Sequence, residues 1–256
     1  MSNPSDVIEG LKSIGIRASA NAIHALLEQL TKSKASPAQV CENLTVLERR
    51  ERDARNLRSR TQMATLGSFK TLDRFDWNHP KSLDKALYEE LHGLAFLEQG
   101  DNVLFRGTSG LGKTTLAQNI GLSALEKGFT VRFSTLAAVL ADLLKQESLP
   151  AFERRLKRYT LPDLLIIDEL GYLPCDSRSA DMLYNIISRR HEKASTIITT
   201  NLAFKQWGTV FPGAACVVAL VDRFSQHCHV MDIEGESWRQ KETNEPRPPL
   251  QKKKKR

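Results

Sequence analysis

The chain carries one stretch with the spacing of a phosphate-binding loop, GTSGLGKTT from Gly107 to Thr115. The stretch matches the pattern G-x-x-x-x-G-K-[ST] and lies between an apolar run and a helical pattern, which is the context that the pattern requires. Glycines let backbone N–H groups turn toward an anion, and the positive end of the following helix points at the same place. A glycine-rich turn that binds nothing is the alternative. We expect the phosphates of a nucleotide to be bound by Gly107, Thr108, Ser109, Gly110, Leu111, Gly112, Lys113, Thr114 and Thr115.

Four polar side chains have individual roles in this prediction. The ammonium of Lys113 should reach the β- and γ-phosphates, and the hydroxyl of Thr114 should bind Mg²⁺. Further along, the apolar run 164–167 ends in two acids, as a buried strand that delivers carboxylates to the edge of a sheet would. Asp168 is placed to hold Mg²⁺ through water, opposite Thr114. Glu169 is expected to orient a water molecule that attacks the phosphate, and a plain surface acid is the alternative.

Two more residues extend this set of catalytic candidates. Asn201 ends the strand pattern that begins at Ser195 and could hold the attacking water beside the γ-phosphate, or it could be a turn asparagine. Arg223 could stabilise charge on the transferred phosphate across a subunit boundary, or it could form a helix-end charge pair with Asp222. Arg189 and Arg190 are further candidates for an intersubunit or DNA role, and the sequence does not separate the two.

The segments around these residues alternate between strand and helix patterns. Near-continuous apolar strands separated by helical stretches predict a parallel sheet that is covered on both faces. The ligand of such a sheet lies at the carboxyl ends of the strands, where the glycine-rich loop, Asp168 and Asn201 all fall. We expect strands at 102–106, 129–133, 164–167, 196–199 and 230–233, and helices at 113–127, 135–146, 151–159, 178–191, near 203–208 and at 215–226.

The first 66 residues have a helical pattern that ends in an arginine block. Ser36, Pro37 and Gln39 form the start signal of a helix, with a capping serine, a first-turn proline and a capping-box glutamine. That helix continues into 49–60, where six arginines stand against two acidic residues, which favours contact with nucleic acid. A solvated helix with pairs such as Glu48–Arg52 is the alternative. The candidate DNA-binding residues are Arg49, Arg50, Arg52, Arg55 and Arg58, with a second cluster at Arg154, Arg155, Lys157 and Arg158, which could equally pair across a subunit interface.

Residues 67–100 precede the glycine-rich loop and contain the stretch Thr71–Trp77. Its aromatic and aliphatic side chains suit the flat face of a base, so this stretch could wall an adenine pocket. A helix is expected near 83–97.

The composition agrees with a basic α/β protein. The 256 residues are 41% hydrophobic and carry a net charge of +7, with a pI near 9.3, which favours a polyanionic partner or an acidic surface. No apolar run approaches a membrane span and the start lacks a leader, so we expect a cytoplasmic protein without membrane contact. The four cysteines form no C-x-x-C pair and are expected to be reduced. A zinc site at 227–229 is disfavoured, because successive side chains of a strand point to opposite faces.

The motifs GTSGLGKTT, LLIIDELGYLP, STIITTN and LVDRF, with the ending Gly235–Arg239, together resemble the IstB family of bacterial transposition helper ATPases, relatives of the DnaC-type helicase loaders in the AAA+ group. The resemblance spans nearly the whole chain. It implies an α/β AAA+ P-loop core with a parallel sheet between helices, a small all-helical N-terminal domain and no substantial C-terminal lid. It also implies Lys113 and Thr114 as Walker A, Asp168 and Glu169 as Walker B, Asn201 as sensor 1 and Arg223 as an arginine finger.

The resemblance further implies ATP and Mg²⁺ as cofactors, and an ATPase that is stimulated by DNA. Such a protein would form a homo-oligomer, a ring or a spiral, on duplex DNA with weak sequence preference, and would recruit and stimulate a transposase. The expected domains are 1–66 for DNA or partner binding, 67–240 for the ATPase and 241–256 as a disordered basic tail. This chain departs from the family in its tail, PRPPLQKKKKR, and in Trp238, where the family more often has tyrosine.

Three alternatives have distinct signatures. A replicative helicase loader would share the chemistry but bind a ring helicase. A DNA-coating scaffold would hardly turn over its nucleotide, although the catalytic positions are intact. A small-molecule kinase would need a substrate-binding lid and no basic arms.

Overall fold

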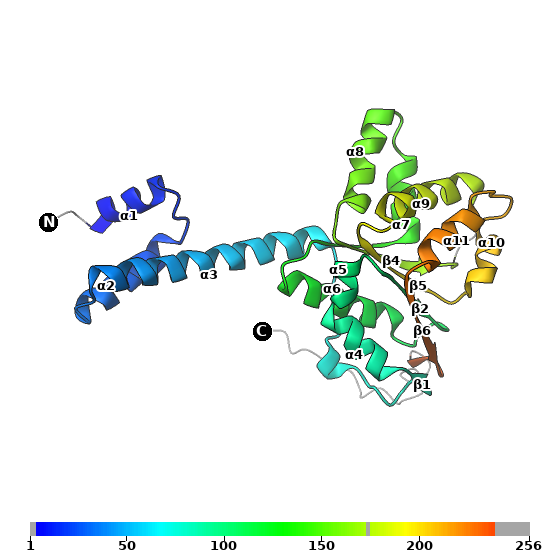
Figure 1. Cartoon of the computed structure of the whole chain (residues 1–256), viewed down its shortest axis with the longest axis horizontal. Helices are drawn as coiled ribbons and strands as arrows, with labels where there is room; N and C mark the ends of the chain where they lie inside the picture. Colours follow the sequence, from blue (N-terminus) through cyan, green and yellow to red (C-terminus); the bar gives the residue numbers. More distant parts are fainter. Residues whose placement is uncertain (1–3, 173–174, 239–256) are drawn as a thin grey trace, which may run out of the picture. The chain divides into compact units, whose positions relative to one another are not determined.

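A computed structural model gives the fold of the chain and describes residues 4–172 and 175–238. The chain divides into two compact units, Met1–Gln62 and Met63–Arg256. The boundary lies within the long helix α3 (Pro37–Ala64), which Figure 1 draws in light blue.

The first unit is helical, as predicted. Helices α1 (Pro4–Ser13) and α2 (Ala20–Lys32) precede α3, and Ile8, Ala18 and Ile23 form the centre of a small apolar core. The start of α3 has the predicted capping box. The backbone N–H of Ser36 donates to the side-chain oxygen of Gln39 at 2.8 Å, and the N–H of Gln39 donates to the Ser36 hydroxyl at 3.3 Å.

The second unit alternates strands and helices. Its elements in chain order are η1 (Leu72–Arg74), β1 (Ser82–Leu83), α4 (Lys85–Gly93), α5 (Ala95–Gln99), β2 (Asn102–Arg106), α6 (Lys113–Glu126), β3 (Val131–Thr135), α7 (Leu136–Leu144), α8 (Leu149–Thr160), β4 (Leu164–Leu170), α9 (Ser177–Arg190), β5 (Ser195–Thr200), η2 (Phe204–Gln206), α10 (Trp207–Val210), α11 (Val217–Ser225) and β6 (Cys228–Glu234). Within the described residues, the strands form one sheet in the order β1-β6-β2-β5-β4-β3. The sheet is parallel except for β1, which pairs antiparallel with β6.

Helices cover both faces of this sheet, so the predicted three-layer α/β arrangement is confirmed (Figure 1). Alternate residues of β4 face the two layers. Leu165 and Ile167 pack in the core formed with α7, α9 and α11, whereas Ile166 faces α6, where its side chain lies against Gly121. Because β4 is buried on both faces, it needs an uninterrupted apolar run, and the carboxylates can follow only where the run ends.

Three local predictions differ from the structure, and one short strand was not predicted. Strand β3 starts at Val131 and not at 129, because the N–H of Phe129 donates to the carbonyl of Ala124 at 2.9 Å and completes the end of α6. The helix expected near 83–97 is divided into α4 and α5 at Leu94, which has a left-handed φ of +72°. The helix expected near 203–208 is the short η2 followed by α10. The two-residue strand β1 was not predicted, because it is too short to show a period.

Strand β6 is the last complete element within the described residues. The expected disordered tail at 241–256 lies outside the described residues. Among the described helices, none combines the length and the apolar character that crossing a membrane requires.

Candidate nucleotide-binding and catalytic site

The loop between β2 and α6 has the conformation of an anion cradle. Gly110 and Gly112 both have φ of +84°, a left-handed conformation that residues with a Cβ rarely adopt. Gly112 caps the start of α6, whose free N–H groups point into the loop. A Cβ on Gly112 would lie 2.6 Å from the ring of Phe75, so only glycine fits between the loop and that ring.

Lys113 is held inside this loop by the loop itself. Its ammonium donates to the carbonyls of Gly107 and Thr108, each at 2.7 Å, and the residue is 5% exposed. The charge therefore lies at the centre of the cradle, where the phosphates of a nucleotide would be bound.

The two acids end β4 as predicted, and a third residue joins them. Asp168 accepts hydrogen bonds from the hydroxyl of Thr114, at 2.9 and 3.1 Å to its two oxygens, and from the hydroxyl of Thr199. The N–H of Glu169 donates to the same Thr199 hydroxyl at 3.1 Å. Glu169 has a left-handed φ of +64° at a register irregularity of β4, which costs free energy and aims its side chain away from the regular alternation of the strand.

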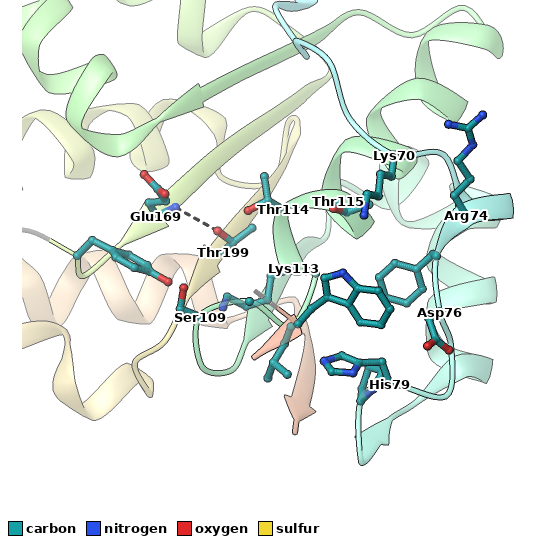
Figure 2. A pocket seen from close by; sticks show the side chains of 17 residues that line it. Lys70, Arg74, Asp76, His79, Ser109, Lys113, Thr114, Thr115, Glu169 and Thr199 are labelled. Atoms are coloured by element: carbon teal, nitrogen blue, oxygen red, sulfur yellow. Dashed lines mark hydrogen bonds between the residues drawn. The ribbon is translucent and has the colours of Figure 1, made fainter. Parts of the chain in front are cut away.

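Lys113, Thr114, Glu169 and Thr199 line one pocket with a volume of about 320 Å³, within the range of small-molecule sites. Asp168 is not among the lining residues and reaches the pocket only through its contacts with Thr114 and Thr199. Figure 2 shows Glu169, Thr199 and Thr114 toward one end, Lys113 and Ser109 on the loop, and Asp76 and His79 toward the other end. The lining residues are Lys70, Arg74, Phe75, Asp76, His79, Pro80, Ser109, Gly110, Leu111, Gly112, Lys113, Thr114, Thr115, Glu169, Tyr172, Thr199 and Trp238.

The aromatic end of the pocket is formed by one segment that precedes the glycine-rich loop in the sequence and one that follows it. Phe75 comes from the Thr71–Trp77 stretch, and Trp238 follows β6. The ring of Trp238 meets the ring of His79 edge to face at 4.7 Å, and its backbone N–H donates to the carbonyl of Gly110 at 3.1 Å. The pocket thus has a charged end suited to phosphates and a flat-sided end suited to a base.

Two predicted catalytic residues do not line this pocket within one chain. Asn201 follows β5, is exposed, and has its amide oxygen 3.3 Å from the point where a Cβ of Gly171 would be. Arg223, in the last turn of α11, stacks its guanidinium over the ring of Tyr184 at 5.0 Å.

Several lining residues were not predicted as site residues from the sequence: Lys70, His79, Tyr172, Thr199 and Trp238. Thr199 left one usable signal. It follows the apolar pair Ile197 and Ile198 in a central strand, beside the strand that carries both acids.

The prediction that Arg190 acts on DNA or at a subunit boundary is wrong. The side chain is 1% exposed, and its guanidinium donates to the carbonyl of Pro162 at 2.7 Å and to the hydroxyl of Thr196 at 3.0 Å. Arg190 therefore ties the end of α9 to the starts of β4 and β5. Arg189 is half-exposed and forms two hydrogen bonds of 2.7 Å with the carboxylate of Glu153, which lowers the pKa of that carboxyl.

The arginine block on α3 separates into two groups. Arg52 and Arg55 pair with Glu48 at 3.3 and 3.1 Å, and Glu48 also accepts from the N–H groups of Arg17 and Ala18, at 2.7 Å each. Burial by itself raises the pKa of Glu48, but these N–H groups and Arg55 outweigh it, so the pKa is lowered. The exposed members of the block, which Glu48 does not hold, include Arg49, Arg50 and Arg58.

Some residues of the second basic cluster, on α8, also form ion pairs within their own unit. Arg155 pairs with Asp142 at 3.0 Å and Arg158 reaches it at 4.0 Å. The Tyr159 hydroxyl donates to the same carboxylate at 2.7 Å, and burial together with that bond raises the pKa of Tyr159 to about 12. Arg154 and Lys157 are exposed.

The donor set at the end of β4 fits a magnesium ion. The hydroxyl of Thr114 and the carboxylate of Asp168 are oxygen ligands of the kind Mg²⁺ prefers, and they already lie in contact. For zinc at 227–229 there is no such set. Among the residues that the structure describes, no group of three or more His, Cys, Asp or Glu could hold a metal ion, and burial raises the pKa of Cys228 to about 12.

A glycine-rich loop at a helix start, a buried lysine and two acids at the end of the neighbouring strand, all on a parallel α/β sheet, define a P-loop ATPase of the AAA+ group. The family model of the IstB-like ATP-binding proteins matches residues 10–246. The chain therefore belongs to that family.

Curated relatives agree with this family. The ATP-binding protein of insertion sequence IS21 from Pseudomonas aeruginosa is 36% identical over 220 residues, which cover 86% of this chain and 83% of the relative. The corresponding protein of IS232 from Bacillus thuringiensis subsp. berliner is 39% identical over 204 residues, 78% and 82% of the two chains.

Solved structures agree with the fold. The replication initiator DnaA, bound to AMPPCP and single-stranded DNA, is 20% identical with a TM-score of 0.55, over 67% of this chain and 52% of the other. The DnaC helicase loader is 20% identical with a TM-score of 0.52, over 64% and 96%.

Proposed function

We propose that this protein is a DNA-dependent ATPase that assists transposition of an insertion sequence. ATP binding drives its assembly on duplex DNA, the assembly recruits and stimulates a transposase, and hydrolysis drives release. Family membership supports the ATPase and its link to an insertion sequence. The observation that carries DNA binding is the group of exposed arginines Arg49, Arg50 and Arg58 on α3, in a chain with a net charge of +7. On this proposal, residues 1–66 bind DNA or the partner and residues 67–240 hydrolyse ATP.

The residues of the pocket divide the work of hydrolysis. The N–H groups of the loop and the ammonium of Lys113 bind the phosphates, and Phe75 and Trp238 take the two sides of the base. Thr114 and Asp168 would hold Mg²⁺, which when bound neutralises charge on the phosphate oxygens. Glu169, which lines the pocket, orients the attacking water.

Asn201 and Arg223 act at the edges of this site. Asn201 lies one residue beyond β5 and assists in holding the water once the nucleotide is bound. Arg223 acts on the nucleotide of a neighbouring copy, because it stacks on Tyr184, outside the residues that line its own pocket. The site is then complete only in the oligomer, which would make turnover depend on assembly.

A titration of duplex DNA during phosphate release tests the proposal directly. We expect the turnover per subunit to rise with DNA and with protein concentration. A protein that hydrolyses ATP equally fast as a dilute monomer without DNA would contradict the proposal, and DNA binding with negligible turnover would indicate a scaffold.

A helicase loader is the second candidate, because the DnaC loader shares the fold. A pull-down with a ring helicase and the transposase of the same element, offered together, separates the two functions. Capture of the transposase supports the proposal, and capture of the helicase alone would replace it.

A further inference from the structure

The hydroxyl of Thr199 lies between the two acids of the site and contacts both. Thr199 is the fifth residue of β5 and is 1% exposed. Its oxygen accepts from the N–H of Glu169 at 3.1 Å, while its hydrogen bond to Asp168 ends on a carboxylate oxygen. A hydroxyl has one proton, and an N–H can only donate, so the Thr199 proton must point at Asp168. The direction of both bonds is therefore fixed.

The strand register explains why one threonine reaches both acids. Ile167 pairs with Ile198 and Leu170 pairs with Thr200, so Asp168 and Glu169 share a single opposing residue. Two residues facing one define a β-bulge, in which a ladder bond is missing. The Thr199 hydroxyl accepts the N–H of Glu169 at this bulge.

The bulge is also where the backbone is strained. Glu169 has a left-handed φ of +64°, which is strained for a residue with a Cβ. Such a conformation persists only where surrounding bonds hold it. The bond from Glu169 to Thr199 is one of these, and it is made at the residue whose side chain enters the pocket.

The second hydrogen bond of Thr199, from its hydroxyl to Asp168, helps to orient that carboxylate. The carboxylate of Asp168 accepts one hydrogen bond from the hydroxyl of Thr114, on α6, and one from the hydroxyl of Thr199, on β5. With one bond from each side, the carboxylate is held in one orientation, with an oxygen directed at Thr114. Groups that orient a ligating carboxylate in this way affect metal affinity as well as rate.

We propose that Thr199 is a positioning residue for ATP hydrolysis, which orients Asp168 for the metal and stabilises the bulge that presents Glu169 to the pocket. This inference rests on the roles proposed above for Asp168 and Glu169. It assigns to Thr199 no contact with the reacting atoms.

The chain offers a matched control in the next residue. Thr200 is buried on the same strand, donates to the carbonyl of Leu170 at 2.7 Å and accepts from the N–H of Leu202 at 3.0 Å. Its hydroxyl, like that of Thr199, bonds to main chain, but to no carboxylate. Valine has nearly the shape of threonine, so Thr199→Val and Thr200→Val each remove one buried hydroxyl from β5.

The experiment compares the full-length protein with Thr199→Val, Thr199→Ser and Thr200→Val. The readouts are kcat and KM, the Mg²⁺ concentration for half-maximal rate, and the affinity for a fluorescent ATP analogue with Mg²⁺ and with EDTA. We expect Thr199→Val to lower kcat about 10- to 100-fold and to raise the required Mg²⁺ concentration, with the affinity in EDTA changed less than about twofold. Thr199→Ser keeps the hydroxyl and should have kcat and a Mg²⁺ requirement near wild type. Thr200→Val should also leave kcat and the Mg²⁺ requirement near wild type.

Two results would overturn the inference. One is a Thr199→Val protein with wild-type kcat and Mg²⁺ dependence. The other is an equal loss in Thr200→Val, which would mean that any buried hydroxyl of β5 matters only for stability. If Thr199→Val does not fold, Thr199→Ala carries the same expectation. Glu169→Gln separates this inference from the proposed function: full turnover in Glu169→Gln removes the role of Glu169, whereas lost turnover there with a normal Thr199→Val removes the role of Thr199 alone.

Discussion

The hydroxyl of Thr114 donates to the carboxylate of Asp168 at 2.9 Å, so the first turn of α6 and the end of β4 meet directly. These residues are far apart in the sequence and come together because both lie at the carboxyl edge of one parallel sheet. The contact brings the phosphate loop and the acidic pair together in one place. It also sets the order in which substitutions should affect binding and hydrolysis.

Replacing Glu169 by glutamine should separate binding from turnover. Glutamine keeps the size of the side chain and removes the carboxylate that orients water, so we expect ATP binding within about twofold and kcat lowered at least about 100-fold. On the proposed function, in which hydrolysis drives release, the protein should also remain longer on DNA. Phosphate release and DNA dissociation kinetics measure both effects. The exposed Glu98, changed to glutamine, is the control, and unchanged turnover in Glu169→Gln would remove Glu169 from its role.

Arg223 should act on a neighbour's nucleotide. Arg223→Ala should bind ATP normally and lose about 10³-fold or more in kcat. Glu169→Gln is equally inactive but keeps its arginine, so mixing the two variants should restore part of the activity at the mixed interfaces. Phosphate release at a fixed total concentration and varying ratio measures this. A mixture no faster than its components would indicate that Arg223 serves its own chain or none.

The aromatic end of the pocket should contribute to nucleotide affinity. Stacking on a base is worth roughly 1–3 kcal/mol, so Trp238→Ala should weaken ATP binding by about tenfold or more. Trp238→Phe keeps a flat ring and should stay close to wild type. Isothermal titration with ATP and with inorganic triphosphate distinguishes the base from the phosphates, because only ATP should respond to Trp238→Ala. An equal loss for triphosphate would mean that the residue supports the loop instead.

The exposed arginines of α3 should determine the salt dependence of DNA binding. Changing Arg49, Arg50 and Arg58 to glutamine should flatten the slope of log affinity against log salt by roughly one unit for each phosphate that an arginine no longer neutralises. Lys32→Gln, exposed on α2, is the control for a change of charge alone. An unchanged slope in the triple variant would place DNA elsewhere. Arg52 and Arg55 are poor choices for this test, because Glu48 pairs with them and their removal would also disturb the fold.

The first unit should lose stability in acid through Glu48. The folded-state pKa of this carboxyl is lowered, so its contribution is complete above the ordinary pKa of glutamate, about 4.3, and is lost as the pH falls through the folded value. Thermal unfolding by circular dichroism from pH 7 to pH 3.5 measures the loss. Glu48→Gln should cost about 1–3 kcal/mol at pH 7 and show less of the acid effect. The exposed Glu42, changed to glutamine, should leave the profile unchanged, and a Glu48→Gln profile parallel to wild type would contradict the assignment.

The sequence was sufficient for the elements that carry their own signal. The phosphate loop, the acidic end of β4 and the capping box of α3 are each contiguous, so local spacing identifies them. The parallel sheet followed from the alternation of apolar runs and helical stretches.

The missed residues depend on contacts between distant segments. Lys70, His79 and Trp238 surround the loop only after the chain has folded, and none belongs to a periodic pattern. Arg190 shows the opposite error. A charged pair at a helix end suggests a surface, but the neighbouring carbonyls bind its guanidinium and the side chain is buried. A charged residue in a sequence does not show whether the folded chain provides buried hydrogen-bond partners for it.

Glycine at position 110 leaves space for the residues after β6. Ser237 lies where a Cβ of Gly110 would be, and the main chain at Trp238 is bonded to the loop. A shortened version that stops at the end of β6 would keep the whole sheet and still lose part of its nucleotide pocket. Anyone who trims this protein for crystallisation, or fuses a reporter to it, must therefore retain the chain at least through Trp238.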